Sequence, residues 1–221
     1  MRIHQLTTPT KRFALYGIGI LITFCFIFGK FAEELIEEDL HAFDMAIINF
    51  IQSFISVEST KIMKLFTFMG STKGIVGFSV LVIFLMVLNK KWWESLFFAV
   101  AVVGSSGFNL LLKWIFHRAR PNIHPLIAET GYSFPSGHSM VSLAFYGMLA
   151  YFLVLFLKNR TTKKITIIAF SFLIFLIGIS RIYLGVHYPS DVIAGFSAGG
   201  VWLIVCLIFL NIIIDIRRKK Y

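Results

Sequence analysis

Six long stretches of the chain contain no charged residue. They cover residues 13–29, 74–88, 95–112, 139–157, 165–180 and 192–214. A helix that crosses the hydrocarbon core of a bilayer needs about 20 predominantly apolar residues, and these stretches approach that length once their flanks are included. With 57% hydrophobic and only 14% charged residues, the chain is far more apolar than a soluble domain. We therefore predict an all-α, polytopic membrane protein with six transmembrane helices.

Two of the six stretches need comment. Residues 74–88 are short, and we expect them to be extended by residues 60–73, with a bend at Gly70. The first stretch follows a basic N-terminus, as in a signal peptide, but it is longer than a usual signal core and lacks a small-residue cleavage site. It is therefore predicted to remain as the first helix. We find no repeat, low-complexity segment or linker, and we interpret residues 1–221 as a single membrane-integral domain.

The positive charges predict an orientation in the membrane. Segments 1–12, 89–94, 158–164 and 215–221 carry 13 of the 21 Lys and Arg residues, and cytoplasmic loops are enriched in these residues. We expect a cell-membrane protein with both termini in the cytoplasm. Because the basic residues are scattered over several loops, the net charge of +10 does not indicate nucleic-acid binding. Nothing in the sequence indicates an obligatory protein partner.

The first outer loop contains a further helical pattern. In residues 40–56, apolar positions recur at helical spacing, whereas His41, Asp44, Asn49, Gln52 and Ser53 fall between them. This pattern favours a helix that lies in the outer membrane interface. Ordinary packing of this helix against the bundle is an equal alternative.

Three cations lie at the predicted outer ends of transmembrane segments. Lys113 and Arg120 belong to the sequence KWIFHRARP, and Arg181 follows the fifth apolar stretch. Charges at the ends of spanning helices are costly, and three of them from separate segments indicate a functional site. Arg118 has no comparable pattern of its own, and we assign it no role.

Residues Ser136, Gly137 and His138 directly precede the fourth apolar stretch. The N–H groups at the start of a helix, together with its dipole, favour an anion. Arginine side chains bind phosphate oxygens in a bidentate manner, and lysine adds a compact charge. These residues predict a site for a phosphoryl group, whose transition state is stabilised by donors held in place.

Two histidines and an aspartate supply the expected chemistry. His187 precedes the sequence YPSD, in which Pro189 is expected to open the sixth helix and Asp191 to lie in its first turn. Asp191 can then orient the imidazole of His187, whose other nitrogen is free for nucleophilic attack. His138, at the edge of the phosphate site, is suited to protonate the leaving alkoxide.

These residues together resemble the type 2 phosphatidic acid phosphatase superfamily, whose signature is KxxxxxxRP, then PSGH, then SRxxxxxHxxxD. All three blocks are present without departure, as Lys113, Arg120 and Pro121, then Pro135 to His138, then Ser180, Arg181, His187 and Asp191. The motifs span residues 113–191, and the six-helix layout extends the similarity, in particular to the membrane-integral lipid phosphatases of bacteria.

The resemblance implies a phosphohistidine intermediate on His187, a proton from His138, and neither metal nor cofactor. It implies that phosphate is bound by Lys113, Arg120, Ser136, Gly137, His138 and Arg181. The expected reaction is removal of phosphate from a membrane lipid at the outer face. The substrate expected first is phosphatidylglycerol phosphate, with phosphatidic acid or undecaprenyl pyrophosphate as other candidates.

Several alternatives remain at this stage. Undecaprenyl pyrophosphate hydrolysis as the main role and phosphoryl transfer to another lipid are both compatible with the motifs. A vanadium haloperoxidase has the same motifs, but relatives of that kind are soluble. A zinc hydrolase would use His117, His138, His187 and Asp191, whose spacing matches no known ligand pattern. An anion carrier would place its charges near the middle of the bilayer.

Overall fold

The computed structural model describes residues 7–218, and within that range the chain forms helices and no strand. Five single helices are long and apolar enough to cross a membrane, and a bent pair of shorter helices provides a sixth span. The predicted fold class, an all-α protein with six transmembrane segments, is confirmed. In order the helices are α1 (Thr8–Ile36), α2 (His41–Gln52), α3 (Val57–Met69), α4 (Thr72–Leu88), α5 (Trp92–Phe116), α6 (Gly137–Phe156), α7 (Arg160–Tyr183) and α8 (Pro189–Arg218).

The second span is the bent pair, α3 and α4. The two helices meet at an angle of 51°, and α3 ends with Gly70 as its C-cap. A methyl group at Gly70 would lie 2.5 Å from Ile177 Cγ2 and 2.8 Å from Ser142 Oγ. The bend expected at Gly70 is present, and it is pressed against α6 and α7 at a point where only glycine fits.

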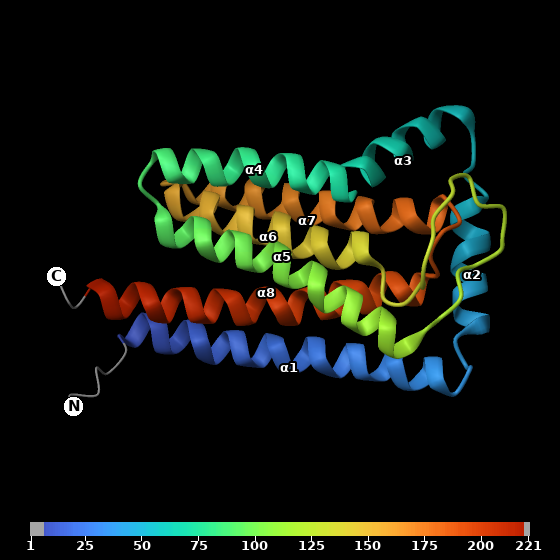
Figure 1. Ribbon diagram of the computed structural model, residues 1–221, viewed down its shortest axis with the longest axis horizontal. Coiled ribbons are helices and arrows are strands. Elements are labelled where there is room, and N and C mark those ends of the chain that lie inside the picture. The colour runs from blue at the N-terminus through green and yellow to red at the C-terminus, as the bar shows by residue number, and fades with distance from the viewer. Residues whose placement is uncertain (1–6, 219–221) are drawn as a thin grey trace.

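The long helices run side by side, and the segments that carry the sequence motifs gather at one end of the bundle (Figure 1). The described part of α1 begins, and that of α8 ends, at the opposite end, where the basic links 89–91 and 157–159 also lie. The topology therefore separates the motif segments from these basic links, as the sequence predicts. Residues 1–6 and 219–221, which carry some of the predicted inner charges, lie outside the described residues.

Helix α2 crosses the motif end of the bundle and runs almost perpendicular to the long helices (Figure 1). Its place in the first long connection agrees with the predicted interfacial helix. The equal alternative, packing against the bundle, also holds, because Asp44, one of the polar positions of the pattern, is only 1% exposed. Helix α2 packs on α7 and α8, and Asp44 turns toward them to meet an arginine and a helix N-terminus.

The protein interior lies between α5, α6, α7 and α8. Phe98, Phe145, Phe152, Ile177 and Leu210 are buried in one cluster there. Large apolar side chains on the outward faces remain exposed, as expected for a bundle that is surrounded by hydrocarbon. Helices α6 and α8 approach closely, since a methyl group on Gly195 would lie 2.6 Å from the carbonyl oxygen of Ser136. This contact fixes the start of α6 beside the start of α8.

Candidate active site

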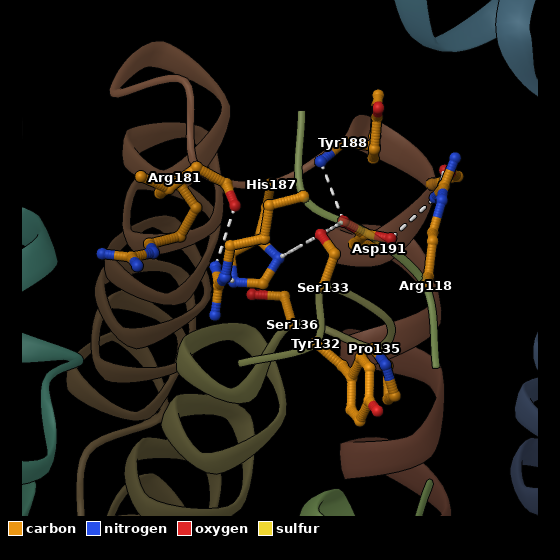
Figure 2. Close-up of polar contacts among 12 residues, drawn as sticks. Arg118, Tyr132, Ser133, Pro135, Ser136, Arg181, His187, Tyr188 and Asp191 are labelled. Carbon is orange, nitrogen blue, oxygen red and sulfur yellow. Dashed lines mark hydrogen bonds and ion pairs between the residues drawn. The ribbon is translucent and has the colours of Figure 1, made fainter. Parts of the chain in front are cut away.

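Three segments supply the polar side chains at the motif end of the bundle. The first is the connection after α5, which leaves the helix at His117 in the left-handed conformation (φ 49°). The second is the start of α6, where Ser136 is the N-cap and accepts a hydrogen bond from the N–H of Ser139. The third is residues 184–188 with the first turn of α8, which opens with Pro189. Helix starts and a loop therefore meet in one place (Figure 2).

His187 is buried, and its hydrogen bonds define its tautomer. Arg120 Nη1 lies 3.1 Å from Nε2. Because a guanidinium only donates, Nε2 must be the unprotonated acceptor. Nδ1 then carries the proton and faces Asp191 Oδ2 at 3.3 Å and Ser133 Oγ at 3.2 Å. A neutral imidazole with an unprotonated Nε2 is the form that a histidine nucleophile requires.

The surroundings of His187 keep the ring neutral. Burial lowers its pKa from 6.5 to about 4, and the charges of Arg181 and Arg120 add to this effect, while Asp191 opposes it. His187 is thus neutral throughout the physiological pH range. Since the unfolded chain takes up this proton at about pH 6.5 and the folded chain only near 4, acidification between these values disfavours the folded state.

Asp191 is fully buried and uses both carboxylate oxygens (Figure 2). Oδ2 accepts hydrogen bonds from the Ser133 hydroxyl and from the N–H of Tyr188, the latter at 2.9 Å, and it faces His187. Oδ1 pairs with Arg118 Nη1 at 2.7 Å. The carboxylate is therefore held from both sides, with one oxygen on the imidazole and the other on an arginine.

Arg120 and Lys113 extend toward His187 from the end of α5 and the segment behind it. Arg120 donates to the carbonyl oxygens of Val186, Thr130 and Gly131 at 2.9–3.0 Å. Lys113 Nζ donates to the carbonyl oxygen of Tyr132. Both cations are bound to neutral carbonyl groups, so their positive charge is not cancelled by a directly paired acid.

Arg181, in the last turn of α7, is only 1% exposed and is paired with Glu129 and Thr67. Burial opposes ionisation of Glu129, but Arg181 outweighs it and lowers the pKa of that carboxyl group below its usual value. Nε of Arg181 is buried and has no hydrogen-bond partner among the described residues. An unsatisfied guanidinium N–H in a buried position is suited to an anion that enters the site.

The start of α6 contributes backbone donors. Gly137 and His138 are its first two residues, whose N–H groups have no acceptor one turn earlier in the helix. The N–H of Ser136, which we expected to face the anion, instead donates to the carbonyl oxygen of Asp191 at 2.9 Å. Its hydroxyl accepts from Ser139. Ser136 therefore joins α6 to α8, and Gly137 and His138 provide the available N–H groups.

A cavity of about 660 Å³ connects these groups to the flank of the bundle. Its polar end contains Lys113, Arg120, His138 and His187. Most of its remaining wall is apolar and comes from α4 and α5, including Val76, Val103, Leu110 and Trp114, which are 55–71% exposed. A few further polar residues, among them Asn109 and Glu129, also line it. Since the exposed apolar side chains face hydrocarbon in a bilayer, the cavity opens sideways between the two helices.

The structure brings the predicted residues together in two layers. Lys113, Arg120, Gly137, His138 and His187 line the cavity, whereas Ser136, Arg181 and Asp191 are buried and held by neighbouring groups. The sequence interpretation missed four further polar side chains in this network, Asp44, Arg118, Glu129 and Ser133. Arg118 lies within the first motif and Ser133 just before the second, and this proximity was the one sequence feature that could have indicated a role for them.

A zinc site would require His117, His138, His187 and Asp191 to converge. In the part of the chain that the structure describes, no three His, Cys, Asp or Glu side chains are grouped so that they could share a metal ion. His117 instead packs its ring against Tyr132, with 4.5 Å between the ring centroids. The residues of the zinc alternative therefore do not form a ligand set.

The comparison with protein families decides the relationship. The model of the PAP2 superfamily matches residues 94–214, which is more than half of the chain and includes every motif. The chain belongs to the PAP2 superfamily. This membership confirms the resemblance identified from the sequence motifs, and together with the similarity to phosphatidylglycerophosphatase B described next it confirms the prediction of a lipid phosphatase.

Individual PAP2 proteins extend the similarity beyond the motifs. Phosphatidylglycerophosphatase B of Bacillus subtilis is 36% identical over 162 residues, or 73% of this chain and 77% of the relative. A lipid A 1-phosphatase of Rhizobium etli is 36% identical over 49% of this chain and 47% of its own length. The crystal structure of a transmembrane PAP2-type phosphatidylglycerolphosphate phosphatase from Bacillus subtilis superposes with a TM-score of 0.80 at 30% identity, covering 86% of this chain and 94% of that chain.

Proposed function

We propose that this PAP2 protein removes phosphate from a membrane lipid through a covalent phosphohistidine on His187. The observation that carries the proposal is the placement of His187, whose Nε2 lies 3.1 Å from Arg120 Nη1 at the polar end of a cavity with mostly apolar walls. A nucleophile, cations and an opening toward hydrocarbon are what a lipid phosphate requires. Phosphatidylglycerol phosphate is the substrate that we test first, because similar PAP2 proteins carry that name.

In the proposed reaction, Lys113, Arg120, Arg181 and the N–H groups of Gly137 and His138 bind the phosphoryl oxygens. Arg120 turns from Nε2 of His187 to the phosphate as it enters. Nε2 attacks phosphorus, the bond to the lipid oxygen breaks, and His138 protonates that oxygen. A water molecule then attacks the phosphohistidine with His138 as the base, which releases inorganic phosphate and restores the neutral imidazole.

Purified protein is expected to release phosphate from at least one member of a panel that contains phosphatidylglycerol phosphate, phosphatidic acid and undecaprenyl pyrophosphate. We expect activity to survive exhaustive chelation, because the proposed roles are filled by protein side chains. Vanadate should inhibit, since it adopts five-coordinate geometry in a phosphate site. Loss of activity on chelation that zinc or magnesium restores would contradict the mechanism, and a panel without phosphate release would contradict the function.

We also propose that the site faces the outside of the cell membrane, with both termini in the cytoplasm. The basic links at the opposite end of the bundle from the site support this orientation. A cysteine introduced at Asn122, which is exposed at the motif end, should react with an impermeant thiol reagent on intact cells, and one at Asn159 should not. Assays in a variant without Cys25 and Cys206 remove the background, and the reverse labelling pattern would place the site in the cytoplasm.

A further inference from the structure

A row of buried charges connects α2 to the proposed catalytic pair. Arg118 donates from Nη1 to Asp191 Oδ1 at 2.7 Å and from Nη2 to Asp44 Oδ2 at 2.8 Å. The side chain of Arg118 is 13% exposed, and those of Asp191 and Asp44 are 0% and 1% exposed. One guanidinium is therefore shared between two carboxylates that have almost no contact with solvent. Asp44 comes from α2, which none of the family motifs includes.

Asp44 also binds the first turn of α8. The N–H of Ser190 donates to Asp44 Oδ1 at 2.9 Å, and the Ser190 hydroxyl donates to Oδ2 at 2.7 Å. Ser190 is the second residue of α8, where N–H groups have no helical acceptor and a negative charge is favoured. Arg118 Nη1 completes the contact by donating to the same hydroxyl at 2.7 Å. The helix turn that carries Asp191 is thereby fixed to α2.

Arg118 restricts the rotation of the Asp191 carboxylate. It holds Oδ1, so that Oδ2 alone faces His187 Nδ1. The guanidinium is itself held in plane, because its carbon lies 4.0 Å from the centroid of the Tyr188 ring. Its donors form a rigid fork that matches carboxylate geometry. A carboxylate fixed in this way keeps the proton on Nδ1 and leaves Nε2 unprotonated.

We propose that Arg118 and Asp44 are positioning residues for phosphoryl transfer, which hold Asp191 in the orientation that keeps Nε2 of His187 ready to attack. The proposal rests on the assignment of His187 as the nucleophile. Neither residue is among the described residues that line the cavity, so their effect on catalysis passes through Asp191 and the first turn of α8. Helix α2 thus belongs to the catalytic apparatus.

Because charged groups surround His187, the positioning role of Arg118 should be visible in the pH dependence of kcat. The ring of His187 interacts with the charges of Asp191 from α8, Arg120 and Glu129 from the connection after α5, Arg181 from α7 and His138 from α6. Lys113 from α5 lines the same cavity. Arg118 offsets the negative charge of Asp191. Without that offset, Asp191 stabilises the imidazolium, and His187 holds its second proton to higher pH. The enzyme then loses its nucleophile earlier on acidification.

The test compares Arg118→Gln, Arg118→Lys and Asp44→Asn with the parent enzyme on one lipid phosphate. Each variant is expected to lower kcat by about 10- to 100-fold, by analogy with the loss found when a residue that orients a metal ligand is removed. KM and vanadate affinity should stay close to the parent values. Arg118→Gln should shift the acid limb to higher pH by at least about one pH unit. Arg118→Lys and Asp44→Asn should not, because they keep the positive charge.

Two controls make the outcome decisive. Lys30→Ala removes an exposed ion pair with Glu33 in the last turns of α1 and should behave like the parent. His187→Ala, in the same assay, tests the proposed function separately, since residual turnover in that variant would show that His187 is not the nucleophile. Parental kcat in Arg118→Lys and Asp44→Asn would overturn the positioning role. A second pattern in Arg118→Gln would also overturn it. If vanadate affinity falls by the same factor as kcat and the acid limb of the pH profile does not shift, the substitution has distorted the phosphate site.

Discussion

His187→Ala is expected to abolish phosphate release from every substrate, whatever its leaving group. The reason is that Nε2 forms the covalent bond to phosphorus in the proposed mechanism, so no other group can replace it. The buried imidazole and its pairing with Asp191 at 3.3 Å support this role. Phosphate release from a lipid phosphate and from nitrophenyl phosphate, measured under saturating conditions, provides the readout.

A matched histidine serves as control for that experiment. His41 is exposed at the start of α2 on the same end of the bundle, and His41→Ala should retain parental turnover. Trapping after rapid acid-free quenching should detect a phosphorylated protein in the parent and none in His187→Ala. An active His187→Ala enzyme, or a phosphorylated residue other than His187, would refute the mechanism.

His138→Ala is expected to lose about 10²- to 10⁴-fold in turnover of a lipid phosphate, the range for a general acid. His138 lines the same cavity as His187 and occupies the first turn of α6, so it can reach the departing oxygen. A lipid alkoxide must be protonated as the bond breaks. Nitrophenolate leaves without such help, and the loss on nitrophenyl phosphate should therefore be clearly smaller.

The comparison between the two substrates isolates the proton transfer. Vanadate affinity of His138→Ala shows whether the phosphate site is intact, since the N–H of residue 138 is retained in the variant. If oxyanion affinity is unchanged and the losses on both substrates are equal, His138 is not the acid. Asp191→Asn is expected to fall between the two histidine variants, because the imidazole remains but its orientation is no longer held.

Much of this site follows from local sequence. The spans arise from apolar composition, the bend at Gly70 from the absence of a side chain, and the helix that opens with Pro189 from the fixed backbone angle of proline, and each of these acts over a few positions. His187 and Asp191 are four residues apart, so their pairing could be anticipated from a helix start alone. The same holds for the N-cap Ser136 and the first turn of α6.

The parts that sequence did not predict depend on contacts between distant segments. Asp44 lies 146 positions from Ser190 and 74 from Arg118, and helical periodicity cannot tell whether a lone carboxylate on α2 faces water or a buried guanidinium. The pairing of Glu129 was missed for the same reason, since this residue lies in the connection between α5 and α6 and its partner Arg181 is in α7, 52 positions away. Ser136 shows a third limit, because a backbone N–H that is free in an isolated helix is taken here by α8.

The pair between Glu129 and Arg181 has a consequence for how tightly the enzyme holds an anion. The carboxylate of Glu129 is 31% exposed and holds Nη2 of Arg181, whereas Nε of the same guanidinium has no partner among the described residues. In the proposed mechanism, a phosphoryl group that binds at Nε meets a cation whose charge is already partly offset by this acid. Its affinity is therefore expected to be lower than at an unpaired guanidinium. The same offset is expected to favour departure of inorganic phosphate after hydrolysis, and so to limit inhibition by the product.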